Sequence, residues 1–246
     1  MKTFWLSILH VFTALLGANA QFVTVYTPLE SMTLPGNTPI VADHWEYQQL
    51  FDASLFSSIP TGGGSIRNIT LRPSPNSKSL YTELTGIAIE LSTTTKSVDS
   101  LSPVFAENKS SDNFVFWSGE NVTFYLNSDA QGNMVWSPSF SVLPGKGFSY
   151  NPSKGNLLMT IHNLHLPEGS SATSYDGVRS SLRTASVRAD AGMDRGTVSS
   201  EGLVVSFAFS DIVPEPSSVT ILALGSMVLL GISRQIAGRK DLDVVP

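Results

Sequence analysis

Four carboxylate residues of this chain could support hydrolytic chemistry. Glu83 and Glu90 lie on neighbouring or continuous strand segments, and Glu46 and Asp52 lie near aromatic residues. A glycosidase needs two carboxyl groups, about 5 Å apart for retention or about 6.5–9.5 Å apart for inversion. Because any acid-rich β-domain offers such pairs by chance, we assign no catalytic residue. A secreted hydrolase that acts on polysaccharide stays as the alternative.

Metal-ligating residues are also sparse. His162 and His165 are close in sequence, but residues 157–166 have a strand pattern. Residues three apart on a strand point to opposite faces, so we expect no shared metal. Residues 190–196 and 129–133 resemble calcium loops in composition, yet they lack the alternating oxygen ligands of an EF-hand. We therefore expect no cofactor, with a structural calcium as the alternative to a polar surface loop.

Aromatic side chains offer a third kind of chemistry, because an exposed ring can stack on a sugar. Their usual place is the core, and the pattern alone leaves both alternatives open. The candidates for an exposed platform are Trp45, Tyr47, Phe116, Trp117, Tyr125 and Trp136.

Composition excludes several functions. The chain has no cysteine, so thiol nucleophiles and zinc–thiolate sites are ruled out and no disulfide stabilises the fold. It has 15 basic and 20 acidic residues, a formal net charge of −5, and no run of lysine or arginine. We therefore expect no nucleic acid as a partner.

The apolar residues between the two termini recur with a step of two, as in strands with one buried face. The clearest run places Leu203, Val205, Phe207 and Phe209 in the core. We predict a mainly β fold in which residues 21–212 form a single β-sandwich of jelly-roll type. Further strands are predicted at 22–27, 66–71, 87–91, 114–117, 122–126, 140–143 and 157–166. The best candidate for a short helix is 45–55, and 151–155 is a predicted turn with Pro152 at its second position.

The N-terminus has the pattern of a secretory signal peptide. Lys2 precedes an apolar stretch over residues 4–16, and Ala18 and Ala20 form a small-x-small cleavage site. We predict a signal helix over residues 1–20 that is cleaved before Gln21. An uncleaved N-terminal anchor is the alternative.

The C-terminus has a second hydrophobic segment, at 213–240. It starts with Pro214, Glu215 and Pro216, which disfavour a helix through the triplet. An uncharged run over 219–232 follows, and the longer stretch 217–237 is enough to cross the roughly 30 Å hydrocarbon core as a transmembrane helix. The basic residues after this run are expected to stay on the cytoplasmic side; they are Arg234, Arg239 and Lys240. Residues 241–246 form a short extension beyond them.

A Pro-Glu-Pro triplet, an apolar helix and a basic tail resemble the PEP-CTERM sorting signal of bacterial envelope proteins. The resemblance implies export, temporary anchoring in the inner membrane with the domain outside the cytoplasm, and processing near the triplet by an exosortase. The final location is then the cell envelope or the extracellular space. A tail anchor without processing is the alternative.

Four segments of the central domain resemble a group of uncharacterised PEP-CTERM proteins. They are residues 47–56 (YQQLFDASLF), 91–96 (LSTTTK), 112–119 (DNFVFWSG) and 148–159 (FSYNPSKGNLLM). The group has no established activity, so the resemblance supplies no catalytic residues. Proteins with this signal are generally associated with exopolysaccharide-producing bacteria. We therefore expect a non-enzymatic envelope or matrix protein, structural or adhesive, with exopolysaccharide as a candidate partner.

Overall fold

The computed structural model describes most of the central domain. The described residues are 21–27, 38–41, 45–60, 62–73, 81–125, 139–143, 145–164, 174–178, 182–190 and 192–212. The chain divides after Val213 into two units, and all described residues belong to the first. The predicted signal peptide and the predicted sorting tail both lie outside the described residues. Within those residues, no helix is long and apolar enough to cross a bilayer.

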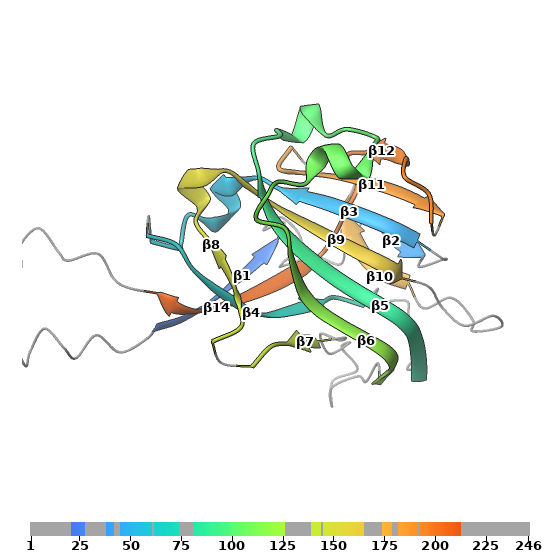
Figure 1. The fold of residues 1–246 in the computed structure, drawn as a ribbon, viewed down its shortest axis with the longest axis horizontal. Coiled ribbons are helices and arrows are strands. Elements are labelled where there is room, and N and C mark those ends of the chain that lie inside the picture. The colour runs from blue at the N-terminus through green and yellow to red at the C-terminus, as the bar shows by residue number, and fades with distance from the viewer. Residues whose placement is uncertain are drawn as a thin grey trace, which may run out of the picture. The chain divides into compact units, whose positions relative to one another are not determined.

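The described chain is mainly β, with short 3-10 helices between strands (Figure 1). The first strands are β1 (Gln21–Thr27), β2 (Thr38–Val41), β3 (Trp45–Phe51), β4 (Gly64–Leu71), β5 (Tyr81–Thr94), β6 (Phe114–Tyr125) and β7 (Ser139–Ser141). The later strands are β8 (Phe148–Tyr150), β9 (Asn156–Leu164), β10 (Ser174–Val178), β11 (Thr184–Asp190), β12 (Thr197–Ser199), β13 (Gly202–Leu203) and β14 (Val205–Ile212). The 3-10 helices are η2 (Ala53–Phe56), η3 (Val98–Ser100), η4 (Phe105–Asn108) and η5 (Pro152–Lys154).

These strands form three antiparallel sheets. The five-stranded sheet has the order β1-β14-β4-β7, with β8 also paired to β4. The six-stranded sheet has the order β12-β11-β3-β9-β5-β6, and a three-stranded sheet has the order β13-β10-β2. The main hydrophobic core contains side chains from both larger sheets, such as Ile69 and Phe207 from one and Ile89 and Ile161 from the other. Two sheets that enclose one core in this way are consistent with the predicted β-sandwich.

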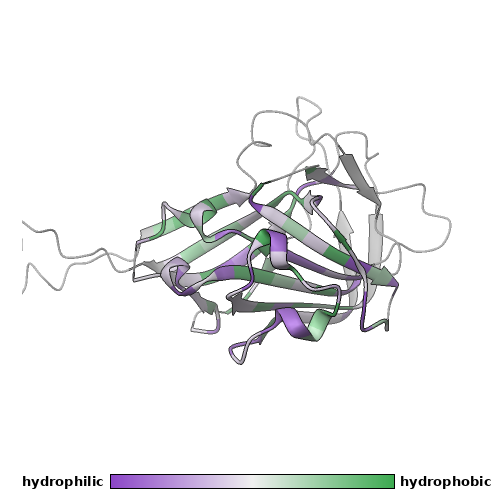
Figure 2. Cartoon of the chain, turned by 90° about the horizontal axis from the view of Figure 1, so that it is seen from above, coloured by the Kyte–Doolittle hydropathy of each residue, from purple (hydrophilic) through white to green (hydrophobic). Residues whose placement is uncertain are grey.

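The alternating patterns of the sequence locate the core correctly. Leu203, Val205, Phe207 and Phe209 are all fully buried, as predicted. In Figure 2, hydrophobic and hydrophilic segments alternate along many of the strands, as expected where one face of a strand is buried. The predicted turn at 151–155 is also confirmed: Lys154 N–H donates to the Asn151 carbonyl over 3.0 Å, with Pro152 at the second position.

The predicted helix at 45–55 is wrong, since Trp45–Phe51 is strand β3 and only Ala53–Phe56 is a 3-10 helix. Strand β3 lies between β11 and β9 inside the six-stranded sheet. Every side chain from Tyr47 to Phe51 is buried. A strand covered on both faces loses the step of two that distinguishes a half-buried strand.

The second face of β3 is covered by the connection between β5 and β6. Leu50 and Leu158 on the sheet form a smaller core with Leu101 and Phe105 from this connection. Figure 1 shows the 3-10 helices of the connection as a separate layer beside the six-stranded sheet. This layer positions the end of β5 and the start of β6, where the candidate site lies.

We predict that Phe207→Ala lowers the free energy of unfolding by about 3–5 kcal/mol, because it leaves a cavity in a rigid core. The Phe207 ring is fully buried, 5.1 Å from the Phe51 ring and 5.8 Å from the Phe56 ring. Phe22→Ala is the matched control, since Phe22 is 77% exposed on β1 of the same sheet. It should change stability by less than about 0.5 kcal/mol. Urea denaturation of both variants measures the difference, and equal losses would contradict the proposed core.

Candidate functional site

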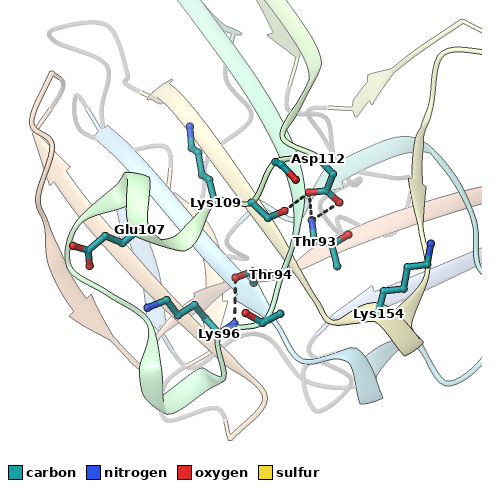
Figure 3. Close-up of a pocket in the computed structure, with 10 residues that line it drawn as sticks. Thr93, Thr94, Lys96, Glu107, Lys109, Asp112 and Lys154 are labelled. Carbon is teal, nitrogen blue, oxygen red and sulfur yellow. Dashed lines mark hydrogen bonds between the residues drawn. The ribbon is translucent and has the colours of Figure 1, made fainter.

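An open pocket of about 320 Å³ lies where β5 ends and β6 begins. Its lining is polar, with hydroxyl, ammonium and carboxylate groups and no aromatic ring. Figure 3 shows Thr93 and Asp112 near its centre, with Lys96 and Lys154 on opposite sides. The lining residues are Thr93, Thr94, Thr95, Lys96, Glu107, Lys109, Ser110, Ser111, Asp112 and Lys154.

Two neighbouring residues hold the η5 turn against the end of β5. Gly155 has a φ of +148°, and a Cβ there would lie 2.6 Å from the Thr94 carbonyl oxygen, so the close approach requires glycine. The Asn156 side chain accepts from Ala53 N–H over 2.8 Å and donates to the Lys96 carbonyl over 2.8 Å. The backbone that carries Lys96 and Lys154 is therefore fixed from behind.

Asp112 organises the centre of the pocket. Its two carboxylate oxygens accept from Thr93 N–H over 2.9 and 3.1 Å, and the Ser110 hydroxyl donates to one of them. Burial acts to raise the pKa of Asp112, but the hydrogen bonds from Ser110 and Thr93 outweigh it, so this pKa lies below its ordinary value. Asp112 is therefore an ionised, exposed acceptor that also binds Thr93 and Ser110 within the protein.

Lys109 connects the pocket to a second group of charged residues on the six-stranded sheet. Its Nζ lies 2.5 Å from Oε2 of Glu90, which also accepts from Asn113 over 3.0 Å. The other Glu90 oxygen lies 3.4 Å from His162 Nε2, and His162 Nδ1 lies 2.5 Å from Glu46 Oε2. One imidazole therefore sits between two carboxylates, and one of those carboxylates also holds Lys109.

The pKa shifts within this group follow from its geometry. The hydrogen bond with Glu46 raises the pKa of His162; burial opposes this rise, and the charges of Glu46 and Glu90 support it. Burial acts to raise the pKa of Glu90, but its bonds with Lys109 and Asn113 outweigh that effect and lower it overall. The arrangement favours an imidazolium flanked by ionised carboxylates.

The expected carboxylate pairs are rearranged in the structure. Glu46 and Glu90, which we placed in different pairs, converge on His162 because β3 and β5 both flank β9. Asp52 instead caps η2 by accepting from Ser54 N–H over 2.9 Å. The side chain of Glu83 lies outside the described residues.

The sequence analysis considered metal binding at three places in the chain. His165 and residues 129–133 lie outside the described residues. His162 is half-buried on the outer face of its sheet, not in the core. Around 190–196, Met193 N–H donates to the Asp190 carbonyl over 3.1 Å in a turn between β11 and β12. Across the described ranges, no group of three or more His, Asp or Glu side chains could hold a metal ion.

The described aromatic candidates do not form a sugar-stacking platform. Tyr47 and Phe116 are buried in the main core, and Trp117 packs its half-buried ring on Phe140 at 5.0 Å. The side chains of Trp45, Tyr125 and Trp136 lie outside the described residues. The candidate aromatic residues whose side chains are described therefore stabilise the fold.

Three of the four segments singled out in the sequence meet at the pocket. Residues 91–96 supply its threonines and Lys96, residues 112–119 supply Asp112, and residues 148–159 supply Lys154. Residues 47–56 lie behind it through the contact of Ala53 with Asn156. Sequence reasoning did not single out the lysines that line the pocket, and only their presence in or near these segments could have drawn attention to them.

Comparisons with family models, with curated proteins and with solved structures find no match. The chemical interpretation of the pocket therefore depends on this chain's own residues.

We predict that the His162 ring titrates above its ordinary value of about 6.5. Because the folded pKa is raised, the stability from protonated His162 is fully present below about pH 6.5 and disappears as the pH rises through the folded pKa. The loss of stability in His162→Gln should thus be larger at about pH 5.5 than at about pH 9. Glu46→Gln should lower the pKa of His162. NMR titration, with the ring signal assigned by its absence in His162→Gln, measures both effects. A ring that titrates at or below the ordinary value in the wild type rules the arrangement out.

Proposed function

We propose that this chain is an exported, non-enzymatic protein of the bacterial envelope or extracellular matrix, and that its β-domain binds polysaccharide in a structural or adhesive role. The observation that carries the binding function is the open pocket of about 320 Å³, lined by hydroxyl, ammonium and carboxylate groups. Sugars present many hydroxyl groups, and a polar lining of this kind offers them hydrogen bonds without a hydrophobic cavity.

The delivery route is supported by the two ends of the sequence. The N-terminal segment has the cleavage pattern at Ala18 and Ala20, and the C-terminal segment has the Pro-Glu-Pro triplet followed by an apolar run and basic residues. In this proposal the helix over 217–237 anchors the protein in the inner membrane with the β-domain outside. An exosortase then processes the tail near the triplet.

A jelly-roll assignment is supported by the strand order. Eight strands of the two larger sheets can be renumbered from 1 to 8 in chain order, with β7 and β8 taken together as strand 6. They are β1, β3, β4, β5, β6, β7 with β8, β9 and β14. In these numbers the two antiparallel sheets have the orders 1-8-3-6 and 2-7-4-5. Two four-stranded sheets connected in this way are typical of a jelly roll. Strands β10–β13 are an insertion before the last of the eight strands. Jelly rolls include lectin domains, so the assignment agrees with a binding function by analogy alone.

The hydrolase alternative has one observation in its favour, the convergence of Glu46 and Glu90 on His162. Glycosidases need a carboxylic acid that stays protonated, which requires a raised pKa. Glu90 has a lowered pKa and is bound to Lys109, the opposite of what a general acid needs. The geometry therefore favours the binding protein over the hydrolase.

Affinity electrophoresis of the full-length protein tests the binding function. We expect slower migration in gels that contain dextran, hydroxyethylcellulose or polygalacturonate than in a plain gel. We also expect no increase in reducing ends when the protein is incubated with the same polysaccharides. Unchanged migration in every gel would rule out polysaccharide binding, and new reducing ends would favour the hydrolase.

The sorting route has a separate test. Replacement of Pro214, Glu215 and Pro216 by alanine should leave export intact, because the N-terminal signal is unchanged. The variant should accumulate in the inner membrane with its tail attached, whereas the wild type should lose mass through removal of the segment after the triplet. Intact-mass spectrometry of membrane and envelope fractions measures this. Identical masses and identical membrane retention would leave only a tail anchor.

A further inference from the structure

The acidic groups of the pocket are already engaged within the protein. Asp112 accepts from Thr93 N–H and from Ser110, and Glu107 Oε2 accepts from the Ser102 hydroxyl over 2.5 Å. The Thr94 hydroxyl accepts from Lys96 N–H over 3.2 Å. Both carboxylates of the pocket therefore already accept hydrogen bonds from the chain before any ligand arrives.

Several hydrogen-bond donors of the pocket, in contrast, have no partner within the described residues. Lys109 is paired with Glu90, but Lys96 and Lys154 form no ion pair with any part of the chain that the structure describes. Within the same described residues, the hydroxyl groups of Thr95 and Ser111 have no hydrogen-bond partner. Each ammonium offers three donors and no acceptor. The pocket thus has two ammonium groups without an ion pair, beside the carboxylates of Glu107 and Asp112, which accept hydrogen bonds from the chain.

We propose that the pocket binds carboxylated polysaccharide, with Lys96 and Lys154 contacting the carboxylates of uronic acid units and with Thr95 and Ser111 contacting sugar hydroxyls. This inference rests on the proposed function and adds the chemical class of the ligand. Figure 3 shows the two lysines on opposite sides of the central Thr93–Asp112 contact, an arrangement suited to an extended chain that crosses the pocket.

A neutral glycan fits the pocket less well. Neutral sugars bring hydroxyl groups but no negative charge, so the ammonium groups of Lys96 and Lys154 would gain hydrogen bonds without a charge partner. A uronic acid unit brings a carboxylate that accepts only, which matches the free ammonium groups. The net charge of the chain is −5, so the attraction is local to the pocket and not a property of the whole surface.

The positions of both lysine backbones are set before binding. Lys96 is held by the bond from Asn156 to its carbonyl, and Lys154 belongs to the η5 turn that packs against Thr94 through Gly155. Binding therefore orders side chains and not loops, which lowers the entropic cost of association.

Calorimetric titration of the full-length protein in mild detergent with oligogalacturonate tests the proposal. The variants are Lys96→Gln, Lys154→Gln and the double variant. Lys146→Gln is the matched control, because Lys146 is an exposed lysine outside the pocket. We expect about threefold weaker binding for each single variant, about tenfold for the double variant, and no change for the control. The salt dependence of the affinity should fall in the double variant, since two charge contacts are lost.

Dextran and polyglutamate are the comparison ligands. Dextran has hydroxyls without carboxylates, polyglutamate has carboxylates without sugar hydroxyls, and we expect both to bind at least tenfold more weakly than oligogalacturonate. Equal binding of oligogalacturonate by the wild type and the double variant overturns the proposal. Binding of polyglutamate that is as tight as that of oligogalacturonate, or tighter, also overturns the proposal, because charge alone would then explain the contact. If dextran binds and oligogalacturonate does not, the proposed function holds and this inference fails. If no polysaccharide binds, both fail.

Discussion

The burial of strand β3 on both faces is the constraint on which the rest of the described structure depends. Two of its buried residues are glutamines, and a buried amide without partners would cost roughly 1–3 kcal/mol. Gln49 points to the main core, where it accepts from Leu203 N–H over 2.8 Å and donates to the Leu203 carbonyl over 3.0 Å. Gly202 makes this contact feasible, because a Cβ there would lie 2.8 Å from the Gln49 amide nitrogen. The amide thereby joins β13 to the interior of another sheet.

Gln48 satisfies the same requirement on the other face and so fixes the layer that carries the pocket. Its amide donates to the Phe105 carbonyl over 3.0 Å and accepts from Asn108 over 3.0 Å. Asn108, itself buried, also donates to the Ser102 carbonyl over 2.8 Å and accepts from Ser102 N–H over 2.8 Å. These bonds attach the β5–β6 connection to the sheet by defined partners as well as by apolar contact. The pocket residues that this connection carries thus stand on a rigid support.

The sequence predicted those strands in which large apolar residues alternate with small or polar ones. Phe207 and Ile89 belong to strands of this kind, and their burial follows from this alternation, although Ser206 and Ser210 on the other face of β14 are buried as well. Strand β3 could not be recognised, because large residues fill both of its faces and because glutamine is rarely a core residue. The charged group around His162 could not be predicted from the sequence either. It depends on β3 and β5 lying on either side of β9, and the β3–β9 pairing joins residues more than a hundred positions apart, which no local pattern encodes.

The two charged regions of the domain, the group around His162 and the pocket, differ in whether their charged side chains form ion pairs. Around His162, each charge has an opposite charge beside it, so the group holds three strands together and has little affinity left for a ligand. In the pocket the charges are not paired in this way: Glu107 and Asp112 accept hydrogen bonds from neutral groups of the chain, and Lys96 and Lys154 form no ion pair within the described residues. Lys109 belongs to both regions, and its bond to Glu90 removes it from the set of free donors. If the pocket binds a ligand as proposed, the ammonium groups available to it are those of Lys96 and Lys154, which form no ion pair within the described residues.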